Sequence, residues 1–299
     1  MKKNKLVSNS FSDKIFIIFV YLFLSIFFVL VLFPLLYVLN ASLSDPQAVI
    51  TGKVFLYPVG FNLRGYQAVF SYHRIMAGFA NSLFYMIVGT LVNIVMTMLC
   101  AYPLSRREFK ARRILSVLIM FTMIFSGGLI PLFIVVDRLG LTDTRWAMIL
   151  PVAMSVWNVM IARTYIVNTI PNELYEASAI DGATPSGFFV KVVLPLSKPI
   201  IAVLVLYYGV GHWNAYFNAL IFLRSQSLFP LQLVLRDILV VNKIDPTLVT
   251  SAEALAARQG MQDLLKYSVI VVASIPVLII YPFVQKYFVK GVMIGSVKG

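Results

Sequence analysis

Long apolar runs alternate with short polar segments along the chain, and this pattern predicts a helical membrane protein. Six runs reach the roughly 20 apolar residues that a helix needs to cross about 30 Å of hydrocarbon. The expected spans are residues 15–39, 82–104, 114–136, 146–167, 200–223 and 267–289. The predicted fold class is therefore all-α, with six transmembrane helices in a single domain at 15–299.

The composition supports a bilayer as the solvent of this chain. Its 299 residues are 60% hydrophobic and 12% charged, whereas soluble proteins are roughly half apolar and a quarter charged. The first apolar run is longer than the h-region of a signal peptide, which has about 7 to 15 residues. We therefore expect it to be retained as a span.

The net charge of +13 is distributed unevenly around the predicted spans. With the N-terminus in the cytoplasm, the inside segments and the adjoining span end carry 14 Lys and Arg residues, against 10 outside. Basic residues concentrate on the cytoplasmic side of membrane proteins, so both termini are expected there. The cytoplasmic segments are then 1–14, 105–113, 168–199 and 290–299. Because the basic residues flank spans, their number does not indicate nucleic-acid binding.

Several function classes are disfavoured by what the chain lacks. None of its 12 acidic residues falls within a predicted span, although ion-driven carriers usually keep ionisable groups near mid-membrane. No GxxxxGK[ST] loop is present, so we do not expect this chain to hydrolyse ATP. Its two histidines have no nearby acid or nucleophile in sequence, which disfavours an enzyme.

One polar island, residues 168–199, has the pattern of two short helices joined by a sharp bend. Pro171 suits the first turn of a helix, and Glu173 favours its N-terminal half through the helix dipole. Gly182 suits the left-handed cap that ends such a helix. Thr184 and Pro185 then fit the cap and first residue of a second helix.

The second helix of the island is expected to end before Pro195. It carries an apolar face that suits packing against the ends of the spans, made of Phe188, Phe189, Val192 and Val193. Small residues at Ala177 and Ser178 would let a neighbouring protein approach the first helix closely. Two interpretations remain open from the residues alone: a loop that packs under the bundle, or a docking surface.

The island also resembles the EAA loop of the membrane subunits of ABC importers. The residues that carry the resemblance are Glu176-Ala177-Ser178, Asp181-Gly182-Ala183, Phe188, Leu194-Pro195 and Pro199. The resemblance implies a type I importer permease fold in which this loop is a cytoplasmic coupling helix seated in a separate ATPase. It assigns the ATPase-coupling role to Glu176, Ala177, Ser178, Asp181 and Gly182.

The resemblance extends along most of the chain. The stretch GHWNAYFNALIFL at 211–223, the ending YPFVQKYFVKGVMIGSVKG, and Asn62-Leu63 with Tyr66 are similar to carbohydrate-uptake permeases related to the smaller maltose-importer permease. They are most similar to the subgroup for complex oligosaccharides. The tail at 291–299 resembles the tails of this family, which reach between the two ATPases.

Partners and cofactors follow from the same resemblance. It implies a homologous second permease forming a heterodimer, two ATPase subunits and an extracytoplasmic sugar-binding protein. It also implies residence in a bacterial cell membrane. ATP and Mg would bind the ATPase, and no cofactor is expected on this chain.

Candidate sugar contacts concentrate in the fifth predicted span. Tyr207, Gly211, Asn214 and Asn218 recur at helical spacing and are expected on one face. The flanking candidates are Tyr208, His212, Trp213 and Tyr216. Aromatic faces stack on sugar rings and amides satisfy sugar hydroxyls. The same residues would also serve as hydrogen-bonding contacts between helices. Trp157 and Asn158 are further candidates in the fourth span.

Other local patterns predict breaks and outer elements. Ser126-Gly127-Gly128 indicates a kink or a close helix approach in the third span. Segments 40–81 and 224–266 are long enough to cover the outer mouth, with helices expected within 62–79 and 248–258. Two functional alternatives stay open: a secondary carrier or channel that works alone, and a structural assembly factor.

Overall fold

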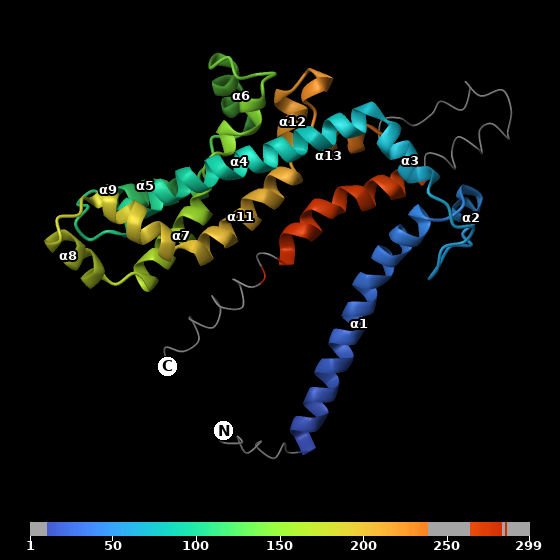
Figure 1. Ribbon diagram of the computed structural model, residues 1–299, viewed down its shortest axis with the longest axis horizontal. Helices are drawn as coiled ribbons and strands as arrows, with labels where there is room; N and C mark the ends of the chain where they lie inside the picture. The colour runs from blue at the N-terminus through green and yellow to red at the C-terminus, as the bar shows by residue number, and fades with distance from the viewer. Residues whose placement is uncertain (1–10, 239–263, 283–284, 286–299) are drawn as a thin grey trace. The chain divides into compact units, whose positions relative to one another are not determined.

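The structure, a computed structural model, describes residues 11–238, 264–282 and 285 (Figure 1). In these ranges every regular element is helical. The chain divides into two compact units, of which the first comprises residues 1–71 and 244–272 and the second 72–243 and 273–299. The helix Leu264–Pro282 contributes to both.

The first unit is built around the end of a long helix, α1 (Phe11–Ser42). Two short helices follow, α2 (Pro46–Ile50) and α3 (Arg64–Ser71). The hydroxyls of Ser42 and Tyr66 are 2.7 Å apart. A Cβ on Gly65 would collide with Leu264 and Ser268, so the absence of a side chain allows α3 to approach the last described helix closely.

Helix α1 is almost entirely uncovered. Its buried residues are confined to its last turn, at Asn40, Ala41 and Ser42. The rest of the helix is strongly apolar, and its most apolar 18 residues have a mean hydropathy of 3.2. A helix that is apolar all round and uncovered by the described part of its own unit is suited to hydrocarbon or to a partner protein.

The second unit is organised on one long helix, α4 (His73–Ser105), with α7 (Val156–Thr169) and α11 (Lys198–Trp213) packed against it (Figure 1). The remaining helices of this unit before residue 170 are α5 (Arg112–Ile124), α6 (Leu129–Arg138), η1 (Arg145–Met148) and η2 (Leu150–Val152). Those after it are α8 (Asn172–Ile180), α9 (Pro185–Phe188), η3 (Phe189–Val193), α10 (Leu194–Leu196), α12 (Phe217–Phe222), η4 (Gln226–Leu228) and α13 (Leu231–Arg236).

Of the buried apolar clusters in the second unit, two include side chains of α4. One joins α4, α7 and α11 through side chains such as Met98, Val159 and Leu204. The other surrounds Tyr85 and Met148. Between helices in a membrane such packing supplies much of the stability, because lipid offers no hydrophobic driving force. The clusters fix α4 as the central support of the unit.

Among the described residues, three helices are long and apolar enough to cross a membrane, and three bent pairs bring the total to six if each pair is one span. The straight helices are Phe11–Ser42, His73–Ser105 and Leu264–Pro282. The bent pairs lie at or next to the third, fourth and fifth predicted spans, with bends of 114°, 52° and 77°, and the last bend falls just before the fifth predicted span. Each of the six apolar runs contains helix where it is described, but the third, fourth and fifth are interrupted.

The break in the third run confirms the kink predicted from its glycines. Gly128 has φ +86°, and added Cβ atoms on Gly127 and Gly128 would meet nothing within 4 Å. Gly128 therefore supplies a left-handed turn, and neither glycine serves a close helix approach. The helix expected in 62–79 is present as α3 and the start of α4. The helix expected at 248–258 and the tail at 290–299 lie outside the described residues.

The fifth run ends earlier than predicted. Helix α11 stops at Trp213, and α12 begins at Phe217. The indole of Trp213 donates to the carbonyl of Ala273 at 2.9 Å. Asp143 accepts from the backbone N–H groups of Arg224 and Ser225, both at 2.8 Å. These tertiary bonds hold the segment in a course that a straight helix to residue 223 would not follow.

Candidate functional site

The first helix of the polar island, α8, ends in a Schellman motif built on Gly182. This glycine has φ +78°. The N–H of Gly182 donates to the carbonyl of Ala179 at 3.1 Å, and the N–H of Ala183 donates to that of Ser178 at 2.9 Å. Both bonds satisfy carbonyls that a helix end leaves free. The predicted left-handed cap is confirmed, while Pro171 precedes the helix instead of occupying its first turn.

The chain restarts as predicted at Thr184. Its side-chain oxygen accepts from the N–H of Gly187 at 3.1 Å, and Pro185 is the first helical residue. The expected stop before Pro195 is wrong, because helical structure continues to Leu196. A π-helical turn, η3, precedes the proline and accommodates its missing N–H. The bend comes instead at Ser197, between α10 and α11.

The residues that were candidates for coupling lie on the surface of this unit. Glu176, Ala177, Asp181 and Gly182 are exposed, and Ser178 is partly buried with its hydroxyl donating to the carbonyl of Tyr175 at 2.8 Å. Ile180, beside them, is 87% exposed. An apolar side chain so fully presented at a helix end is suited to insertion into a partner.

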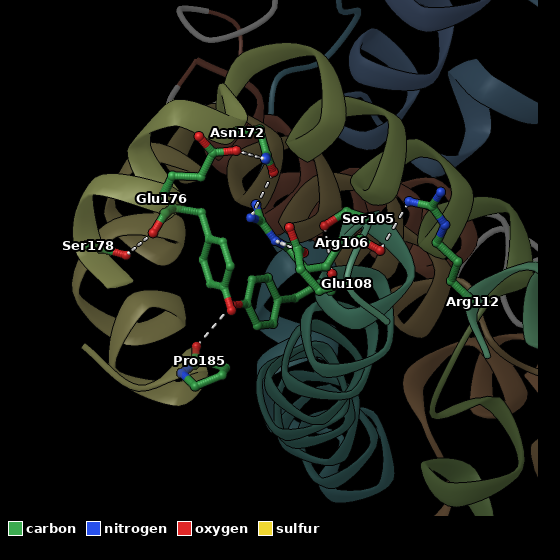
Figure 2. Close-up of polar contacts among 10 residues, drawn as sticks. Ser105, Arg106, Glu108, Arg112, Asn172, Glu176, Ser178 and Pro185 are labelled. Atoms are coloured by element: carbon green, nitrogen blue, oxygen red, sulfur yellow. Dashed lines mark hydrogen bonds and ion pairs between the residues drawn. The ribbon is translucent and has the colours of Figure 1, made fainter. Parts of the chain in front are cut away.

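Helix α8 is attached to the end of α4 through Arg106 (Figure 2). The Arg106 Nη2 donates to Asn172 Oδ1 at 3.1 Å, and Asn172 Nδ2 donates to Glu176 Oε1 at 2.7 Å. The guanidinium also lies over the Tyr175 ring, 4.1 Å from its centroid. Glu108 completes the cluster with an ion pair of 3.5 Å to Arg106 Nε. Glu176 thus orients a polar chain that ends on α4.

The second helix of the island is attached to the same end of α4. The Tyr102 hydroxyl donates to the carbonyl of Pro185 at 2.9 Å. The dashed line at Pro185 in Figure 2 marks this bond. Phe188 and Val193 are buried in the cluster that joins α4, α7 and α11. The predicted apolar face does lie against the ends of the long helices. The island is therefore both packed on the bundle and exposed on its far side.

A cavity of about 510 Å³ lies between α7 and α11. Candidates from the predicted sugar path line it: Asn158, Tyr207, Tyr208, His212 and Asn218. Gly211 also lines it. Tyr207 is half exposed, so its ring is accessible to a ligand. No Lys or Arg is among the lining residues, so the cavity offers aromatic and neutral polar groups.

Four candidates lie away from this cavity: Trp157, Trp213, Asn214 and Tyr216. Trp213 is buried against Phe79, with ring centroids 5.4 Å apart. Asn214 follows the end of α11 and is exposed, and Trp157 is 58% exposed on the outside of α7. Because α11 ends at Trp213, the expected single helical face from Tyr207 to Asn218 is wrong. Asn218 reaches the cavity from α12, and Tyr216 precedes that helix outside the lining.

Two polar residues of α4 support the cavity and were not singled out in the sequence. Asn93 Oδ1 and His212 Nε2 are 2.6 Å apart, and the Asn93 amide also donates to the carbonyl of Val152. Thr97 Oγ1 and the Tyr208 hydroxyl are 2.7 Å apart. Part of the polar face of α11 therefore does bond between helices. The sequence signal that could have identified Asn93 and Thr97 is the presence of polar residues inside an apolar run.

Arg106 was also missed as a functional residue. In the sequence it belongs to the basic stretch 106–113, which has the pattern of an ordinary cytoplasmic loop. Only the fold brings it to Asn172, 66 positions away. Within the described ranges, no three His, Cys, Asp or Glu side chains are grouped as metal ligands.

Comparison with known proteins assigns the family. Residues 93–294 match the model of the inner-membrane component of binding-protein-dependent transport systems. The chain belongs to this family. It is a permease subunit of a membrane transport system, and its relatives are transporters rather than enzymes. The matched region includes α8 and the cavity between α7 and α11.

The permease has similar relatives over nearly its full length. It is 40% identical to the polygalacturonan/rhamnogalacturonan transport system permease protein YtcP of Bacillus subtilis, covering 96% of this chain and 99% of that one. It is 39% identical to Protein LplC of the same organism, over 97% of each chain. A crystal structure of a bacterial ABC transporter involved in the import of the acidic polysaccharide alginate matches with TM-score 0.87 and 34% identity, covering 95% of this chain and 100% of that one.

Proposed function

We propose that this permease forms half of the translocation path of an ATP-driven oligosaccharide importer and transmits the closing of a separate ATPase through α8. The observation that carries the proposal is the double character of α8. Its outer surface, with Ala177, Ile180 and Gly182, is exposed. Its inner surface is joined through Asn172 to Arg106 at the end of α4.

Helix α4 supplies a mechanical connection from α8 to the cavity. Arg106 and Tyr102 hold the two island helices at one end. Further along the same helix, Thr97 and Asn93 bond the cavity residues Tyr208 and His212. A displacement of α8 would move these groups together, because the one continuous helix α4 carries both sets of contacts.

Coupling of this kind needs tight binding between α8 and the ATPase. Shifting a two-state permease from 1:99 to 99:1 requires about 5.5 kcal/mol of differential binding. An exposed helix with an apolar tip at Ile180 offers a shape that a socket in the ATPase can hold. The coupling set is Glu176, Ala177, Ser178, Asp181 and Gly182, with Glu176 acting by orienting Asn172.

The cavity residues suit a neutral face of a sugar chain. Tyr207 provides a ring for stacking, and Asn158 and Asn218 provide amides for hydroxyl groups. The names of the relatives, which include polygalacturonan and rhamnogalacturonan transport, support fragments of complex polysaccharides as the substrate class. Tyr208 and His212 are fixed by α4 and shape the wall.

The assembly we propose contains three further kinds of protein. A homologous second permease completes the path as a heterodimer, and the uncovered apolar surface of α1 is suited to contact with it or with lipid. Two ATPase subunits bind ATP and Mg. An extracytoplasmic sugar-binding protein delivers substrate. Both termini lie in the cytoplasm of a bacterial cell, which the distribution of basic residues supports.

Reconstitution with and without the ATPase tests this function. We expect oligosaccharide uptake into proteoliposomes only with both permeases, the ATPase and ATP, and abolished uptake for Glu176→Lys and Gly182→Pro at normal membrane insertion. Ion-gradient-driven uptake by the chain alone would establish a secondary carrier instead. Normal uptake by both variants would contradict coupling through α8.

A further inference from the structure

A second cavity, of about 530 Å³, lies where α4 ends, α5 begins and α7 ends. It shares no lining residue with the cavity at Tyr207. Four arginines line it: Arg107, Arg112, Arg113 and Arg163. No acidic side chain is among its lining residues. Four like charges around one cavity repel each other, so an anion there would be strongly favoured.

Two of the arginines are fixed by backbone carbonyls. Arg163 Nε donates to the carbonyl of Leu104 at 2.9 Å. Arg112 Nη1 donates to the carbonyl of Arg106 at 3.2 Å. Each bond uses one of the five N–H groups of a guanidinium and orients the rest. The remaining N–H groups are the kind that bind phosphate oxygens in pairs.

Apart from Ser105 and Ser116, the rest of the cavity wall is apolar. Val117 and Met120 come from α5, and Met160 and Val167 come from α7. A free anion gains nothing from contact with an apolar wall. An amphiphile can place its charged head on the arginines and its apolar chain against the wall. Methionine side chains adapt to irregular apolar shapes such as an acyl chain.

The position of the cavity favours a lipid over transported sugar. Arg112 and Arg113 begin α5, and Arg163, in the second half of α7, bonds to Leu104 next to the end of α4, so the arginine side chains gather at the boundary of the membrane-spanning helices. On α7, Met160 and Arg163 point about 140° or more away from Asn158, which lines the other cavity. Basic pockets between helices at the membrane boundary suit acidic lipid headgroups.

We propose that this cavity binds an anionic phospholipid. The phosphate group accepts hydrogen bonds from Arg112, Arg113 and Arg163. One acyl chain lies along Met120 and Met160.

Native mass spectrometry of the full chain tests the proposal, with phosphatidylglycerol and phosphatidylcholine supplied in equal amounts. We expect the wild type to retain phosphatidylglycerol preferentially. Arg113→Gln should lower that preference about fivefold, the effect of one basic residue near an anionic surface. Arg113 is exposed, so this variant should fold normally. Arg163→Gln should act in the same direction.

Lys110→Gln is the matched control, because Lys110 is an exposed basic residue of the same loop that does not line the cavity. We expect it to leave the preference unchanged. An equal fall in Lys110→Gln and Arg113→Gln would show diffuse charge attraction and overturn the proposal. Equal retention of the two lipids by the wild type would overturn it as well.

Two competitors separate a lipid from other anions. Inorganic phosphate should displace phosphatidylglycerol poorly, since it cannot use the apolar wall. Efficient displacement by phosphate would mean a simple anion site. Displacement by trigalacturonate that is lost in Arg113→Gln would mean a passage for acidic sugar. Either result would contradict lipid binding, and neither depends on whether α8 couples to an ATPase.

Discussion

The guanidinium of Arg106 lies over the ring of Tyr175, with its Cζ atom 4.1 Å from the ring centroid. This contact joins the end of the central helix α4 to the middle of the exposed helix α8. Arg106 is buried, whereas the side of α8 that bears Ala177 is exposed. A planar, charged side chain therefore links α8, the helix proposed to move, to the end of α4.

Arg106→Lys should weaken coupling without preventing insertion. Lysine keeps the charge but lacks the planar group that stacks on Tyr175 and donates to Asn172. The lost interactions amount to about 2 kcal/mol. We expect reduced stimulation of ATP hydrolysis by the binding protein in the reconstituted importer.

The control for this variant is Lys110→Gln, which removes an exposed charge from the same loop. It should leave ATP hydrolysis unchanged. Full stimulation in Arg106→Lys, at wild-type expression, would mean that α8 does not depend on this contact.

Uptake by Gly182 variants should depend on how readily the new residue adopts a left-handed backbone conformation. At φ +78° an alanine costs about 1–2 kcal/mol, whereas asparagine adopts this conformation more readily. No atom lies within 4 Å of an added Cβ, so a clash contributes nothing. Uptake should fall in the order wild type, Gly182→Asn, Gly182→Ala.

Gly127→Ala serves as the control for the glycine series, since it has equal space and no left-handed backbone. It should transport at the wild-type rate. Equal uptake by Gly182→Ala and Gly127→Ala would remove the requirement for the left-handed cap.

Gly89→Ala should destabilise the contact between α4 and α11. Its added Cβ would overlap the ring of His212, which bonds Asn93 at 2.6 Å. Overpacking of this kind typically costs about 1–3 kcal/mol. Gly209→Ala, across the same helix pair, would place its Cβ 3.7 Å from Thr90 and should be tolerated. Thermal unfolding in detergent compares the two, and equal midpoints would contradict the close packing.

The contact between Asp143 and residues 224–225 should be sensitive to acid. Hydrogen bonds from the Ser225 hydroxyl and the Ser225 and Arg224 N–H groups hold the pKa of Asp143 below its ordinary value. A lowered carboxyl pKa stabilises the fold above the unfolded value of about 3.9 and stops doing so as pH falls through the folded pKa. The Ser225 amide should therefore lose protection from hydrogen exchange below about pH 4.

Asp143→Asn separates the charge from the backbone conformation, because asparagine also tolerates the φ of +59° at this position. We expect weaker protection of Ser225 at neutral pH and little further loss in acid. Unchanged protection at neutral pH would show that the carboxylate does not hold residue 225.

Local signals in the sequence predicted local structure well. Gly182 and Thr184 act through bonds to residues two to five positions away, so their roles follow from short-range chemistry. The helix break after Trp213 has no comparable signal in the local sequence. It depends on the bond from Trp213 to Ala273 and on the bonds from Arg224 and Ser225 to Asp143. The Arg106 link joins residues 66 positions apart, and a basic loop sequence does not reveal which of its arginines is buried.

The residues that gather at the cavity were easier to find in the sequence than its geometry. Tyr207, Tyr208 and His212, candidates for the sugar path, line it. The helical spacing wrongly extended the lining to Asn214, because periodicity assumes that the helix continues. Asn93 and Thr97, which hold the wall, looked like ordinary polar residues of another span.

Site-specific cross-linking from α8 tests the central claim most directly. Cys100 is the only cysteine of the chain, so Cys100→Ser provides a background for Ile180→Cys. In the assembled importer, a short cross-linker at position 180 should join this permease to the ATPase, with a yield that changes when ATP is added. A cysteine at Ile180 that reacts with soluble reagents yet never joins the ATPase would contradict the proposed coupling.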